Sequence, residues 1–84
     1  MEPALTITIK LKGKSDHIER IRAILLPDFA STVLGEKVEI NGDEAVWMID
    51  LAAKTISRLR AITNSILKAI ALVIEIEDMV ENRS

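Results

Sequence analysis

The sequence has no cysteine, a single histidine, and aromatic residues that make up only 2% of the chain. The absence of cysteine excludes disulfides and thiolate metal sites. His17 alone cannot build a zinc site unless several carboxylates converge on it. Base stacking, which many proteins use to hold single-stranded nucleic acids, needs aromatic side chains that this chain hardly supplies. We therefore expect neither a metal ion nor a cofactor.

The sequence also lacks an excess of positive charge and the length for a second domain. Its net charge is -2, so bulk charge implies no polyanion partner. Its 84 residues leave room for one core, and we expect a single domain over residues 1–84. A chain this short buries only about 60% of its unfolded surface. With disulfides and metal excluded, association with other chains is the remaining source of stability.

Signals for secretion and for membrane insertion are also absent. The stretch Met1-Glu2-Pro3 is not a basic segment followed by an apolar one, so we expect no secretory signal and a cytoplasmic location. The longest apolar stretch, Ile66 to Ile74, is interrupted by Lys68. It is far shorter than the roughly 20 residues that span a bilayer.

Apolar periodicity predicts a strand and a helix in the first third of the chain. Apolar and polar residues alternate strictly up to Lys12, which predicts a half-buried strand over 4–12. Asp16, with Glu19 three residues later, is typical of a capping box that opens a helix. Because proline disfavours helical geometry at the residue before it, Pro27 should end this helix, which we place at 16–26.

The remaining elements are predicted to be a hairpin and one long helix. Asn41-Gly42 lies between two alternating runs, which predicts strands over 36–41 and 44–51, with both central turn residues at positive φ. Aliphatic residues then recur at helical spacing over 53–81. A fourth strand over Val73–Glu77 is the alternative for the end of this helix. The helix is favoured because no glycine, proline or asparagine lies between Asn64 and Asn82.

The predicted fold is therefore α+β, with a three-stranded antiparallel sheet and two helices on one face, in the order strand, helix, strand, strand, helix. Two helices leave the other face of the sheet bare in a monomer. Val46 and Met48 should lie on that face, while Leu72 and Met79 fall outside the main apolar stripe of the long helix. These four residues are the predicted self-association surface, although small sheets also tolerate a few exposed apolar residues.

Two short motifs resemble a known family. The stretch 59–68, Leu-Arg-Ala-Ile-Thr-Asn-Ser-Ile-Leu-Lys, resembles the Leu-Arg-Ala-x-x-Asn-Ser-x-Leu-Arg stretch of the small dimerisation subunit (Pcc family) of the KEOPS complex. The stretch 25–28, Leu-Leu-Pro-Asp, is similar to that family's Leu-x-Pro-Glu. The predicted element order is also the family's, over nearly the whole chain. The chain departs from the family at Lys54 or Ser57, where an acidic residue is common, and at Arg22 or Ile24, where the family has tyrosine.

The resemblance implies a non-catalytic protein that homodimerises and bridges two KEOPS catalytic subunits. Their reaction places threonylcarbamoyl on the tRNA adenosine that follows the anticodon. In the family, both helices lie against helices of the catalytic subunit, which makes Arg22, Arg60, Asn64 and Lys68 the candidate docking residues here. A divergent paralogue, which would cap the dimer in place of a second identical copy, is the alternative.

Other candidate sites have simpler interpretations. His17 lies where a helix should begin, but a general base needs a nucleophile or orienting group within reach, and no such motif accompanies it, so we expect no enzyme. Lys10, Lys12 and Lys14 are a possible tRNA contact. The element order can also suggest a small KH-like RNA-binding module. That module clamps RNA with a Gly-x-x-Gly loop, a spacing that the chain's three glycines never show.

Overall fold

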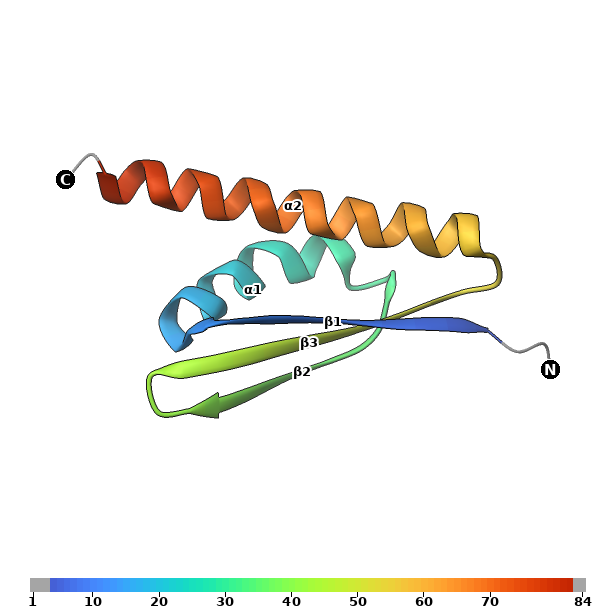
Figure 1. The fold of residues 1–84 in the computed structure, drawn as a ribbon, viewed down its shortest axis with the longest axis horizontal. Helices are drawn as coiled ribbons and strands as arrows, with labels where there is room; N and C mark the ends of the chain where they lie inside the picture. The colour runs from blue at the N-terminus through green and yellow to red at the C-terminus, as the bar shows by residue number, and fades with distance from the viewer. Residues whose placement is uncertain (1–3, 83–84) are drawn as a thin grey trace.

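The computed structural model describes the backbone of residues 4–82 and the side chains of residues 4–76. Its elements follow the order β1 (Leu5–Lys14), α1 (Ser15–Phe29), β2 (Val33–Asn41), β3 (Glu44–Ala53) and α2 (Ile56–Asn82). The strands form one antiparallel sheet in the order β1-β3-β2. Both helices lie on the same face of this sheet (Figure 1). The predicted α+β class, element order and two-layer arrangement are confirmed.

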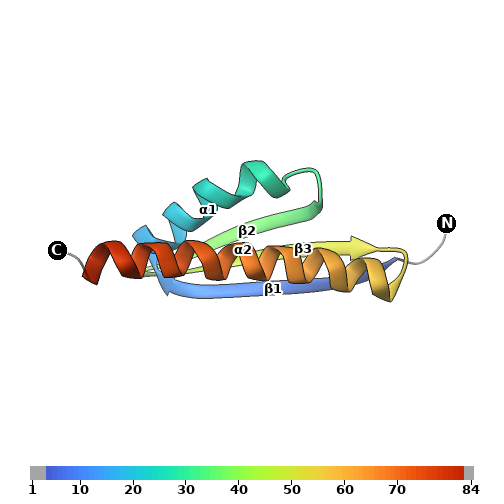
Figure 2. The ribbon, with the colours of Figure 1, turned by 90° about the horizontal axis from the view of Figure 1, so that it is seen from above.

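The central strand β3 shows why the helices cover one face. Its residues Ala45, Trp47, Ile49 and Leu51 are all buried, and they alternate with residues that point to the other face. Seen from above, α2 lies over β3 and β1, whereas the C-terminal end of α1 lies near β2 (Figure 2). The helices contribute six more buried aliphatic residues to the core: Ile18, Ile21, Leu25, Ile66, Ile70 and Val73. Each such side chain stabilises the fold by roughly 1.5 to 3 kcal/mol on burial.

The first helix passes Pro27 and ends at Phe29, so the prediction that it stops at residue 26 was wrong. Proline removes one backbone donor and crowds the carbonyl four residues earlier. That carbonyl belongs to Ala23, and both residues are exposed, so water can solvate the freed group. Phe29 packs against the core, and the Thr32 amide donates to its carbonyl at 2.9 Å. Tertiary packing of the last turn therefore outweighs the local preference.

The predicted capping box at the start of this helix was also wrong. The residue before the helix is Lys14, which makes no side-chain cap bond. The carboxylate of Asp16 instead accepts from the amide of the next residue, His17, at 2.9 Å. The Ser15 amide donates to the Asp43 carbonyl at 2.7 Å. A contact with the hairpin turn, distant in sequence, thus takes the place of a local cap.

The hairpin is confirmed, with two differences in detail. Gly42 alone has a positive φ, at 64°, because the central turn residues are Gly42 and Asp43 rather than Asn41 and Gly42. A positive φ at the first central residue only is typical of a type II′ turn. β2 also begins at Val33, before the predicted residue 36, because a register irregularity between Val33 and Gly35 lets the strand continue.

The second helix begins at Ile56, three residues later than predicted. The hydroxyl of Thr55 accepts from the Arg58 amide at 3.1 Å, which satisfies one of the free donors of the first turn. Ala53, the predicted first residue of this helix, instead belongs to β3, which continues to that residue. The helical backbone then runs to Asn82, which rules out the alternative of a fourth strand over Val73–Glu77.

Candidate functional site

The outer surface of α2 carries three of the four predicted docking residues. Arg60, Asn64 and Lys68 recur every fourth residue, so they form one row along the helix. All three are exposed. The buried Ile66 and Ile70 fix the opposite side of the helix against the sheet. We call this row, with the exposed apolar residues beside it, the outer helical surface.

Large aliphatic side chains are exposed on the same layer. Ile24 of α1 and Leu72 and Ile76 of α2 are 52%, 58% and 51% exposed. At about 100° per residue, Leu72 and Ile76 point toward the α1 side of α2, and the two helices are in contact. Exposed aliphatic side chains that flank a polar row are typical of a surface that receives another helix.

Arg22, the fourth predicted docking residue, lies elsewhere. Its Nε donates to Oε1 of Glu36 in β2, and Trp47 Nε1 donates to the same oxygen at 3.2 Å. The hydrogen bond and charge of Arg22 lower the pKa of Glu36 below its ordinary value, and the hydrogen bond to Glu36 raises the pKa of Arg22. Arg22 is half-buried and therefore ties α1 to the sheet, apart from the outer helical surface.

The predicted self-association residues do not form one surface. Val46 and Met48 lie on the bare face of β3, where both are half-buried. Leu72 belongs to the helical layer on the opposite side of the sheet (Figure 1). The side chain of Met79 lies outside the described residues.

The bare face of the sheet is polar around its two central apolar residues. The Thr8 hydroxyl donates to Asp50 at 2.7 Å, Lys12 pairs with Glu44 at 3.4 Å, and Lys37 pairs with Glu39 at 3.0 Å. Lys10, Lys12 and Lys14, the possible tRNA contacts, are exposed along β1. Because acidic partners interleave with the basic side chains, this face presents mixed charge rather than the positive stripe that phosphate binding favours.

A structural feature that sequence reasoning missed lies beside β1. Leu5 and Ile7 were expected to be covered, since they alternate onto the core side of the strand, but they are 40% and 39% exposed. Ile56 and Leu67 of α2 are also exposed. Ile7, Ile56 and Leu59 line an open depression of about 260 Å³, which Arg60, Thr63 and Asn64 also line. The depression therefore adjoins the row of docking residues. We call Leu5, Ile7, Ile56, Leu59 and Leu67 the β1 strip. The predicted topology could have indicated this exposure, because two helices are too few to cover three long strands from end to end.

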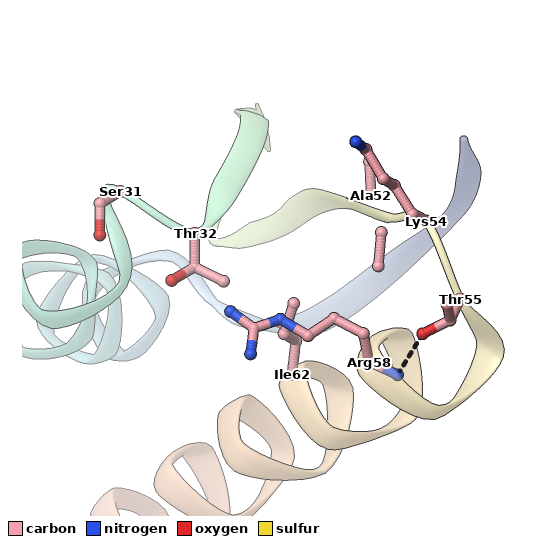
Figure 3. A pocket seen from close by; sticks show the side chains of 8 residues that line it. Ser31, Thr32, Ala52, Lys54, Thr55, Arg58 and Ile62 are labelled. Atoms are coloured by element: carbon pink, nitrogen blue, oxygen red, sulfur yellow. Dashed lines mark hydrogen bonds between the residues drawn. The ribbon is translucent and has the colours of Figure 1, made fainter. Parts of the chain in front are cut away.

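Another depression lies where the turn after α1 meets the start of α2 (Figure 3). It has a volume of about 630 Å³ and is open to solvent. Arg58 extends across it toward Thr32, while Lys54 points away from Arg58 (Figure 3). Its lining holds no carboxylate and no histidine, so it does not assemble an acid and base. His17 lies at the first turn of α1, away from this depression.

Within the described part of the chain, no three histidine, aspartate or glutamate side chains converge as a metal site would require. None of the described helices is long and apolar enough to cross a membrane. No protein-family model, curated protein or solved structure matches the chain. The functional argument therefore depends on the surfaces described above and on the sequence motifs of α1 and α2.

Proposed function

We propose that this chain is a non-catalytic dimerisation and scaffold subunit of the KEOPS type. As such it homodimerises and bridges two catalytic subunits that modify tRNA with threonylcarbamoyl in the cytoplasm. The observation that carries the proposal is the outer helical surface, where exposed aliphatic side chains flank a polar row. The Leu-Arg-Ala-Ile-Thr-Asn-Ser motif of residues 59–65 contributes Arg60 and Asn64 to that row.

The chemistry of this surface suits the docking of a protein helix. Burying Ile24, Leu72 and Ile76 against a partner removes apolar area from water, which favours binding by roughly 25 cal/mol per Å² before the costs of association. Arg60 and Asn64 offer hydrogen bonds at the rim, where polar contacts fix the register of the two partners. Outside this row, Arg22 and Lys12 are engaged in ion pairs within the fold.

The proposal is tested by mixing the chain with a KEOPS catalytic subunit and separating the mixture by size exclusion with light scattering. We expect co-elution in a complex that holds two copies of each chain. Separate peaks would contradict the proposal. A complex that forms only when a second, different small subunit is added would support the paralogous capping subunit instead.

A pair of matched double variants locates the surface. Asn64→Glu with Lys68→Glu changes two exposed positions on the outer helical surface, and Lys10→Glu with Lys37→Glu changes two exposed positions on the bare sheet face. The first variant should remain folded, since exposed substitutions change stability by no more than about 0.5 kcal/mol each, yet it should lose co-elution. The second should co-elute like the wild type. The reverse result would show that the catalytic subunit docks on the bare sheet face.

A further inference from the structure

The depression at the start of α2 is lined by positive charge that no carboxylate in its lining balances. Lys54, which follows β3, and Arg58, in the first turn of α2, both line it, and its lining includes no aspartate or glutamate. By contrast, the guanidinium of Arg22 is paired with the carboxylate of Glu36. Cations around a hollow that carries no negative charge favour an anion there.

Three hydroxyl groups line the same depression. Ser31 and Thr32 belong to the turn after α1, and Thr55 precedes α2 on the other side (Figure 3). The Thr55 hydroxyl accepts a hydrogen bond from the Arg58 amide at 3.1 Å, so its own proton remains available for donation. Because hydroxyls supply donors without adding charge, the lining suits an anion that presents several oxygens.

The guanidinium of Arg58 is placed to contact such an anion. Arg58 is exposed, and its side chain extends across the depression toward Thr32 (Figure 3). The donors of a guanidinium form a planar fork that matches two oxygens of a phosphate. Lys54 points away from Arg58 (Figure 3), but its stem is long and flexible, so its ammonium can approach the same anion from the opposite side.

A smaller depression adjoins the first. It has a volume of about 220 Å³ and shares Thr32, Arg58 and Ile62 with its neighbour. Its remaining lining is Phe29, Ala61 and Ser65. Ala61 and Ser65 are one turn apart on α2, and their small side chains leave room beside the ring of Phe29. An organic group attached to a phosphate at Arg58 would therefore have an apolar surface to cover.

We propose that the two depressions together bind an organic phosphate monoester. The phosphate lies between Arg58 and Lys54, within reach of the hydroxyls of Thr32 and Thr55, and the organic group lies against Phe29. This site goes beyond the proposed function and does not depend on it. Arg58 and Arg60 are two residues apart on α2, so they point to nearly opposite sides of the helix, and the docking row does not include the phosphate site.

The arrangement favours a monoester over the backbone of a nucleic acid. A monoester carries close to two negative charges at neutral pH, so it gains more from the two cations than a singly charged diester does. A nucleic-acid backbone is held by basic side chains that follow it along a groove. Here the two cations are confined to one end of α2, and the chain has a net charge of -2.

Amide NMR titration tests the site, with phenyl phosphate as the probe. At constant ionic strength, phenyl phosphate should shift the amide signals of Thr32, Thr55 and Arg58 until they saturate. Inorganic phosphate should shift the same signals with a dissociation constant about tenfold higher, because it leaves the second depression empty. Shifts that sodium chloride reproduces at the same ionic strength would overturn the site.

Two substitutions of equal charge separate the site from net charge. Arg58→Gln should raise the dissociation constant of phenyl phosphate at least about tenfold. Lys37→Gln removes one positive charge from an exposed position on the bare sheet face and should bind like the wild type. Both variants should be folded by circular dichroism, since both positions are exposed. Equal losses would overturn the site. Arg58→Lys should recover binding only in part, and full recovery would overturn the contact assigned to the guanidinium.

The second depression is tested by filling it. Ala61→Leu places a larger side chain at an exposed position of α2 and keeps a good helix former. It should weaken the binding of phenyl phosphate and leave that of inorganic phosphate unchanged. Phenyl phosphate that binds this variant as tightly as it binds the wild type would overturn the placement of the organic group.

A short single-stranded RNA without a terminal phosphate decides between the monoester and a nucleic-acid surface. It should shift the signals of Thr32, Thr55 and Arg58 less tightly than phenyl phosphate does. Tighter binding that weakens steeply with salt would overturn the monoester and identify an RNA surface instead. None of these measurements uses the catalytic subunit, so failure of the phosphate site would leave the co-elution test of the proposed function as it stands.

Discussion

The two edges of the sheet are built differently. At the β2 edge, Glu36 accepts hydrogen bonds from Arg22 of α1 and from Trp47 of β3, so three elements meet at one carboxylate. A register irregularity between Val33 and Gly35 also breaks the regular pairing of β2 with β3, although the strand itself continues. At the β1 edge, the ladder is regular, and Thr8 and Lys12 bond to Asp50 and Glu44 of β3. Among the described residues, polar side chains therefore tie the β2 edge to the helical layer, whereas those of the β1 edge bond within the sheet.

This difference assigns separate roles to the two edges. Polar contacts that join α1 to the sheet help to set the stability of the monomer, and a strand with a register irregularity is a poor template for pairing with another chain. A regular strand beside exposed aliphatic side chains favours association. Substitutions at the β2 edge should therefore change the free energy of unfolding, whereas those at the β1 edge should change self-association.

The largest effect is expected in the central strand, on which both edges depend. Ile49 is 1% exposed and lies between the two outer strands, opposite Ile9 and Glu36. Ile49→Ala should lower the free energy of unfolding by about 2 to 5 kcal/mol, through lost burial and a cavity. Urea denaturation measures this loss. Ile40→Ala, at a residue 60% exposed in β2, is the control, and an equal loss for both variants would contradict the described core.

The next effect concerns the carboxylate at the β2 edge. Glu36→Ala removes the acceptor of the indole N–H of Trp47, a residue that is only 2% exposed. Leaving such a donor unsatisfied costs about 1 to 3 kcal/mol. Glu36→Gln keeps an acceptor oxygen while removing the charge, so it should cost less. Urea denaturation of both variants checks the order, and a reversed order would mean that the charge, rather than the indole contact, stabilises this edge.

Acid should weaken the same contact. The hydrogen bond from Arg22 lowers the pKa of Glu36 below its ordinary value of 4.5, so the unfolded chain binds this proton more readily than the folded one. The stabilisation is present above the ordinary pKa and is lost as the pH falls through the lower, folded value. The stability advantage of the wild type over Glu36→Gln should therefore shrink as the pH falls from neutrality through 4.5 and then through the lower pKa of folded Glu36. A stability difference that does not change with pH would show that Glu36 binds its proton equally well in the folded and the unfolded chain.

The sequence predicted the fold class because apolar periodicity is a local signal, and the buried residues of β3 and α2 follow it. Element boundaries were less predictable, since distant contacts decide them. Phe29 packs on the core and extends α1 past Pro27, and the Asp43 carbonyl receives the Ser15 amide in place of a capping box. For the candidate site, spacing placed Arg60, Asn64 and Lys68 in one row. The engagement of Arg22 and the exposure of Leu5 depend on how far the helices reach across the sheet, which periodicity does not encode.

The smallest effect on unfolding is expected at the β1 edge. The Thr8 hydroxyl donates to Asp50 at 2.7 Å, but this bond is exposed, so water can replace either partner when it is lost. Thr8→Val keeps the shape and the preference for a strand, and the free energy of unfolding of the monomer should change by no more than about 0.5 kcal/mol. Urea denaturation at low protein concentration, where self-association does not contribute, measures this change. A loss as large as that of Glu36→Ala would show that the β1 edge, like the β2 edge, is held by its polar side chains, and the contrast between the two edges would then be wrong.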